Sequence, residues 1–144
     1  MVPQLKLTGI ALSKGQLSTF LKECPEVAWI ECETEDYLTE GSEGLQMLIK
    51  LREHYPISLH GNSLSLGSVD DLNWSYLKNL ADLIQKISPC LVSDHLSWSS
   101  FNGQYFHQCL PLLLTEASLA HVIERVDQVQ TFLKRQILIE NIVH

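Results

Sequence analysis

The chain has 144 residues, 45% of them hydrophobic, and a formal net charge of -7. This length and composition suit one globular domain with a real core, so we expect residues 1–144 to form a single domain. The negative charge argues against a bulk attraction to nucleic acid or anionic membranes. No signal-like segment or membrane-length apolar run is recognised, so we expect a cytoplasmic protein that binds small molecules, peptides or metal cations.

The first half of the chain alternates strand and helix patterns. Leu7–Leu12 predicts a strand, and the amphipathic segment after it predicts a helix that ends at Pro25. Val27–Thr34 predicts a second strand. Apolar residues at helical spacing predict a helix from about Ser42 to His54. Pro56–His60 is the third predicted strand, and it breaks at once into a polar, glycine-containing loop.

The next segment repeats the alternation. Asp70 or Asp71 is the predicted N-cap of a third helix, whose apolar stripe ends at Ile87. Cys90–Asp94 predicts a fourth strand. An Asn-Gly turn inside Ser97–Phe106 then predicts a small surface hairpin.

The last segment contains the strongest helical pattern. Thr115 is the predicted N-cap of a helix that carries apolar residues on one face as far as Leu133. Gln136–Ile142 predicts a fifth strand. Strict alternation of this kind predicts an α/β fold with a parallel sheet of about five strands and four helices. Since a (β/α)8 TIM barrel needs ~250 residues, the chain supplies about half of one.

Three of the predicted strands end in residues that can bind a metal ion. Alternation of side chains along a strand places Ser58 with His60, and Ser93 with His95, on one face. Glu140 has the equivalent place on the fifth strand. Carboxyl ends of neighbouring parallel strands meet at one edge, so His60, His95 and Glu140 are candidate ligands of one ion. Two imidazoles and a carboxylate suit non-haem Fe(II) and also catalytic zinc.

Further polar residues lie beside these strand ends. Asp94 has the opposite parity to His95 and is a candidate to accept a hydrogen bond from a liganding imidazole. Asn62 and Asn141 are candidates to orient a substrate, or they satisfy the backbone of turns. Glu31 follows the second strand as a candidate base or outer ligand. Packing histidines and a loop-capping glutamate are the alternative interpretation of the whole set.

Several stretches resemble one known family, the TIM-barrel proteins that include MbnB of methanobactin biosynthesis and TglH of thiaglutamate biosynthesis. The two most specific are Ser-Leu-His-Gly-Asn-Ser-Leu-Ser-Leu-Gly-Ser at residues 58–68 and Ser-Asp-His-Leu-Ser-Trp-Ser at residues 93–99. The others are Pro25–Glu31, Leu110–Leu112 with Thr115-Glu116, and Ile139–Ile142. Together they span nearly the whole chain.

The resemblance implies an iron enzyme that uses dioxygen to modify cysteine residues of ribosomally synthesised peptides, helped by a peptide-recruiting partner protein. It maps His60, His95 and Glu140 to iron ligands. Full-length relatives carry two or three irons, but their later ligands have no counterpart before His144. We therefore expect one iron or none in this chain. Leu113-Leu114 also departs from the family, which often has Pro-Tyr there.

Five strands of an eight-stranded barrel leave sheet edges unpaired, so we expect self-association or a complementing half-barrel. Two other functions stay open on the sequence. One is a different metal-dependent TIM-barrel enzyme, of the sugar isomerase or phosphodiesterase type, because fold does not fix chemistry. The other is a non-catalytic half-barrel that serves as a subunit or is a relic.

Overall fold

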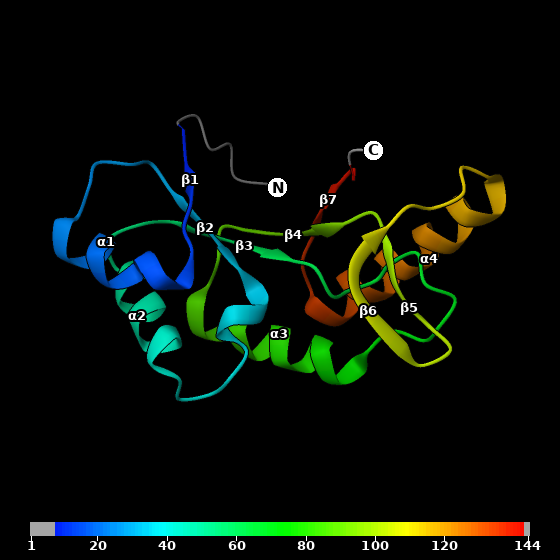
Figure 1. Cartoon of the computed structure of the whole chain (residues 1–144), viewed down its shortest axis with the longest axis horizontal. Coiled ribbons are helices and arrows are strands. Elements are labelled where there is room, and N and C mark those ends of the chain that lie inside the picture. The colour runs from blue at the N-terminus through cyan, green and yellow to red at the C-terminus, as the bar shows by residue number, and fades with distance from the viewer. Residues whose placement is uncertain (1–7, 143–144) are drawn as a thin grey trace. The chain divides into compact units, whose positions relative to one another are not determined.

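The computed structural model describes residues 8–142 and follows the predicted alternation of strands and helices (Figure 1). Four α-helices, two short 3-10 helices and seven strands are formed by these residues. In chain order they are β1 (Ile10–Ala11), η1 (Lys14–Gln16), α1 (Leu17–Glu23), β2 (Ile30–Glu33), η2 (Thr34–Tyr37), α2 (Glu43–Arg52), β3 (Ile57–Gly61), α3 (Trp74–Ile87), β4 (Leu91–His95), β5 (Trp98–Phe101), β6 (Gln104–Leu110), α4 (Glu116–Leu133) and β7 (Leu138–Glu140).

Five of the strands form one parallel sheet in the order β1-β2-β3-β4-β7. Neighbours in this sheet follow one another along the chain, apart from the hairpin between β4 and α4, as in the wall of a (β/α)8 barrel. The predicted α/β class and partial barrel are confirmed. The predicted start of the first strand at Leu7 lies outside the described residues.

Side-chain N-caps are present at α2 and α4, and the one at α4 is the Thr115 cap predicted from the sequence. Ser42 Oγ accepts the Leu45 amide of α2 at 3.3 Å, and Thr115 Oγ1 accepts the Ser118 amide of α4 at 3.2 Å. The predicted cap of α3 at Asp70 or Asp71 is wrong. Asn73 Oδ1 takes this role by accepting the amide of Tyr76 at 3.0 Å.

The described chain falls into two compact units, and the first comprises the residues up to His60 together with Asn79–Val92. Its core is mainly aliphatic, with a few buried aromatic side chains, and long polar side chains form hydrogen bonds at its edge. The Tyr55 hydroxyl donates to the Pro25 carbonyl at 2.8 Å, and Arg52 Nε donates to the Ile87 carbonyl at 3.0 Å. The fully buried aliphatic side chains of this unit include Leu17, Ile30, Leu48, Leu51, Ile57, Leu59, Leu80 and Ile87.

The second unit comprises Gly61–Lys78 and the chain from Ser93 onward, and the predicted hairpin is one of its parts. β5 and β6 are antiparallel, and the turn residues Asn102 and Gly103 both have positive φ, 55° and 77°. Asparagine and glycine tolerate this left-handed conformation better than other residues. The predicted Asn-Gly hairpin is confirmed.

The loop between β3 and α3 is held by hydrogen bonds within the second unit. The Gly67 amide donates to the Ser97 carbonyl of the hairpin at 2.8 Å. From α4, His121 Nε2 lies 2.7 Å from the Ser68 carbonyl, and Arg125 donates to the Asp70 carbonyl at 2.8 Å. The β3–α3 loop is therefore fixed by partners that are distant in sequence.

Helix α4 is confirmed, but only part of its apolar face is covered. Val129 and Leu133 are buried, whereas Leu119, Ile123 and Phe132 are exposed among the described residues.

None of the described helices has the length and hydropathy needed to cross a membrane. The single-domain organisation stays a prediction.

Candidate metal centre

The three predicted ligands lie at the carboxyl ends of adjacent strands. His60 precedes the last residue of β3, while His95 ends β4 and Glu140 ends β7. The register pairs His95 directly with Glu140. Residues directly opposite each other in a sheet present their side chains on the same face, so the parity argument holds for this pair.

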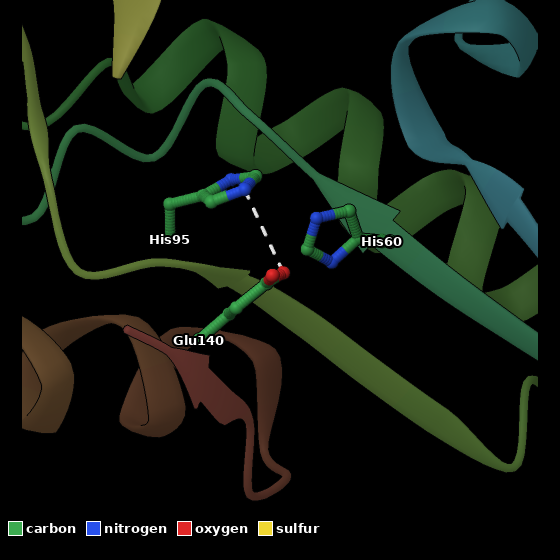
Figure 2. A group of neighbouring side chains, drawn as sticks. All are labelled: His60, His95 and Glu140. Carbon is green, nitrogen blue, oxygen red and sulfur yellow. Dashed lines mark ion pairs between the residues drawn. The ribbon is translucent and has the colours of Figure 1, made fainter. Parts of the chain in front are cut away.

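Figure 2 shows the side chains of His60, His95 and Glu140 pointing toward one another. One ligand atom from each residue can be chosen so that all three lie within 4.8 Å of one another. The shortest measured contact joins His95 Nε2 to Glu140 Oε2 at 3.6 Å. Both imidazoles are half-buried, whereas the Glu140 side chain is 56% exposed.

The orientation of the His95 ring is set by Gly61, the residue that follows His60. His95 Nδ1 lies 3.3 Å from the carbonyl oxygen of Gly61. A carbonyl can only accept, so Nδ1 carries the proton in this hydrogen bond. In the neutral ring Nε2 then keeps its lone pair, and this atom faces Glu140. Metal-binding histidines are commonly oriented in this way by a backbone carbonyl.

Asp94, the residue before His95, is 1% exposed. Its carboxylate accepts the backbone amides of His95, at 2.7 Å, and Leu64, at 3.2 Å. These bonds join the end of β4 to the loop that follows β3. The predicted bond from a liganding imidazole to Asp94 stays a prediction.

Gly61 is packed tightly against the same carboxylate. A Cβ at this position would lie 2.7 Å from Asp94 Oδ2 and 3.0 Å from the Tyr76 hydroxyl oxygen. Real Cβ atoms do not approach other atoms so closely, so glycine is required for β3 to meet Asp94 at this point. The backbone of Gly61 thus remains at the distance that orients His95.

Three other predicted residues lie near the strand ends. Glu31, on β2, accepts a hydrogen bond from Ser58 Oγ at 2.9 Å. The carbonyl of Asn62 accepts the Tyr105 hydroxyl at 3.2 Å, and Asn141 is exposed directly after Glu140. Their roles as base or substrate-orienting groups stay predictions.

Sequence reasoning missed two tyrosines beside the strand ends. Tyr76 of α3 lies next to Gly61, and Tyr105 of β6 reaches the backbone of Asn62 and the hydroxyl of Ser63. Both come from elements remote in the sequence. No periodic or spacing signal links Tyr105 to Asn62, so only the fold reveals the contact.

The three side chains could bind one metal ion after a small movement. Two ligands bound to one ion at ~2.1 Å lie at most about 4.2 Å apart. The observed limit of 4.8 Å therefore needs a sub-ångström movement of flexible side chains.

Burial raises the pKa of the Cys32 thiol on neighbouring β2 to about 11, which disfavours the thiolate form that metals bind.

Comparisons with known proteins agree with this arrangement. The family model described as RiPP precursor modification enzyme MbnB/TglH/ChrH matches residues 7–144. Relatives include UPF0276 proteins from Acaryochloris marina, 47% identical over 93% of this chain, and from Anaeromyxobacter sp. (strain Fw109-5), 42% identical over 93%. A UPF0276 protein from Vibrio parahaemolyticus is 44% identical over 94%.

The aligned segments cover only 48%, 47% and 47% of these three relatives. The chain therefore spans about half the length of the curated relatives it matches. Its match to the family model nevertheless extends over almost all of its own residues. The chain belongs to the family of RiPP precursor modification enzymes that includes MbnB, TglH and ChrH.

Proposed function

We propose that this chain is the N-terminal half of an iron-dependent oxidase that modifies cysteine residues of ribosomally synthesised peptides, with His60, His95 and Glu140 as ligands of one iron ion. The observation that carries the proposal is the convergence of these three ligand atoms within 4.8 Å. Family membership supports a peptide substrate, because the family is described by modification of peptide precursors.

Each residue contributes differently to such a site. Glu140 supplies negative charge, and the Gly61 carbonyl directs the Nε2 lone pair of His95 toward it. The two imidazoles and one carboxylate leave coordination positions open, as non-haem iron oxygenases require. Bound iron would supply one-electron and dioxygen chemistry for the oxidation of a cysteine.

The surrounding residues position the ligands and the substrate. Asp94 fixes the backbone at His95 through its hydrogen bond to that amide. Asn62 and Asn141 orient the peptide from the loops after β3 and β7, and Glu31 is the candidate proton acceptor on β2. A separate protein recruits the peptide, and the part of the relatives' length that this chain does not span supplies the rest of the barrel and the remaining iron ligands.

The experiment that tests the proposal is anaerobic reconstitution with Fe(II), Zn(II) or Mn(II), followed by elemental analysis and turnover assays. We expect bound iron and, with a cysteine-containing peptide, loss of free thiol only after oxygen is admitted. Because half of the relatives' length is not spanned, turnover is measured both alone and with the remaining part of a UPF0276 relative added.

Other outcomes would replace this proposal. The donor set also suits catalytic zinc. Zinc or manganese binding with turnover of a sugar or phosphodiester would therefore support a different metal-dependent barrel enzyme. Absence of metal binding at micromolar concentrations would support a non-catalytic half-barrel.

A further inference from the structure

A pocket of about 400 Å³ lies in the second unit, between the β3–α3 loop and the β5–β6 hairpin. We name it the serine–aspartate pocket. Most of its lining residues carry a hydroxyl or carboxyl group, among them Ser63, Ser65, Asp70, Asp71, Ser100 and Tyr105, and carbon atoms form the larger part of its surface. This volume accommodates one long side chain together with part of a peptide backbone.

The walls of the pocket are held in place by hydrogen bonds. The Asp70 carboxylate accepts the backbone amides of Asn102, at 2.8 Å, and Gly103, at 3.1 Å. Ser68 Oγ of the β3–α3 loop donates to the carbonyl of Ser100, in β5, at 2.6 Å. Such bonds fix the hairpin to the loop, so the pocket is formed before any ligand arrives.

The charge of the pocket is negative. Asp70 and Asp71 both line it, and none of the described lining residues is basic. The carboxylate of Asp70 is already engaged by the hairpin turn, whereas the exposed Asp71 has no hydrogen bond or ion pair with the described residues. Arg125 and His121 bind backbone carbonyls of the loop and do not line the pocket. Asp71 is therefore available to pair with a cation.

The pocket is continuous with the residues around the metal centre. Tyr105 lines the pocket and donates to the carbonyl of Asn62, two residues after His60. Tyr76 also lines it and lies against Gly61. A peptide segment in the pocket would thus lie beside the loop that leaves the end of β3.

From this charge, shape and continuity we propose that the serine–aspartate pocket binds the side chain of a basic residue, lysine or arginine, of the peptide substrate. The proposal rests on the proposed function for its peptide ligand and adds a rule of substrate selection. The pocket hydroxyls, which both donate and accept, bind the adjoining peptide backbone. Asp71 supplies the charge that selects the basic side chain and rejects an acidic one.

The test uses the full chain without metal and three synthetic probes. The probes are N-acetylated, C-amidated heptapeptides of glycine with a central cysteine, and they carry lysine, norleucine or glutamate two positions before it. Binding is followed by amide NMR shifts. We expect the lysine probe to bind about fivefold more tightly than the norleucine probe, as for a partly exposed ion pair, and the glutamate probe to bind most weakly. The shifts should centre on Ser100, Gly103 and Tyr105.

The diagnostic variant is Asp71→Asn, and the matched control is Asp82→Asn, which removes the same charge from an exposed position on α3. We expect the first to reduce the preference for lysine over norleucine to less than twofold and the second to leave it unchanged. Equal binding of the lysine and glutamate probes, shifts centred elsewhere, or no binding at millimolar probe would overturn the proposal. Because no metal is present, these results stand apart from the iron test: charge selection can fail while His60, His95 and Glu140 still bind iron.

Discussion

Gly61 connects a single backbone position to the candidate metal centre, and Gly61→Ala tests this connection. The added Cβ would lie 2.7 Å from Asp94 Oδ2, so the carboxylate must move away from the amides of Leu64 and His95. We expect a loss of about 1–3 kcal/mol in the free energy of unfolding, as for other overpacked interiors. Urea denaturation measures it.

The matched control for Gly61→Ala is Gly15→Ala. No atom lies within 4 Å of a Cβ built at Gly15. Its substitution should change the free energy of unfolding by less than about 0.5 kcal/mol or raise it slightly. Equal effects of the two substitutions would contradict the close packing of Gly61 against Asp94.

The cysteines provide a second test at single residues. Burial raises the pKa of the Cys32 thiol to about 11, so below that pH the thiol stays protonated and unreactive. Cys24 is exposed. At pH 8 we expect iodoacetamide to alkylate Cys24 in the folded chain and Cys32 only after denaturation, as measured by peptide mass spectrometry. Equally fast alkylation of both thiols would show that Cys32 is accessible.

At this scale the sequence identified the metal candidates but not their supports. His60, His95 and Glu140 could be predicted because each lies at the carboxyl end of a strand or one residue before it. The burial of Asp94 and its bond to the Leu64 amide could not be predicted, because they depend on how a loop 30 residues away folds back. Such contacts leave no periodic pattern in the sequence.

At the scale of elements, two substitutions test which residue caps the start of α3. Asn73 Oδ1 accepts the Tyr76 amide, so Asn73→Ala should destabilise the chain by about 1 kcal/mol, a typical N-cap effect. Asp71→Ala, at one of the caps predicted from sequence, should change stability by less than about 0.5 kcal/mol. Urea denaturation and amide exchange in α3 compare the variants. A larger effect at Asp71 would restore it as the cap.

Periodicity predicted the existence and order of these elements but was less accurate at their ends. The strand and helix patterns survive because they reflect which face is buried. The predicted cap of α3 was wrong because the Asp70 carboxylate, although a good N-cap group, instead accepts hydrogen bonds from the amides of Asn102 and Gly103. That competing partner comes from the hairpin, which was itself predicted from its Asn-Gly turn.

At the scale of the molecule, the sequence predicted the parallel sheet and the partial barrel, and the family match supports both. It did not predict how much of α4 would be covered. Leu119 and Ile123 share the helical stripe with buried Val129, yet both are exposed among the described residues. Helical spacing indicates which face is apolar, whereas burial depends on which other segments pack against that face.

The convergence of three strand ends on one metal ion is tested most directly by iron content after anaerobic reconstitution and desalting. The wild-type chain and a His54→Ala control, altered at an exposed histidine, should each retain about one iron per chain. His60→Ala should retain much less iron after desalting, because the loss of a ligand weakens iron binding at least about tenfold. Equal iron content in His60→Ala and wild type, or no retained iron in either, would contradict the account.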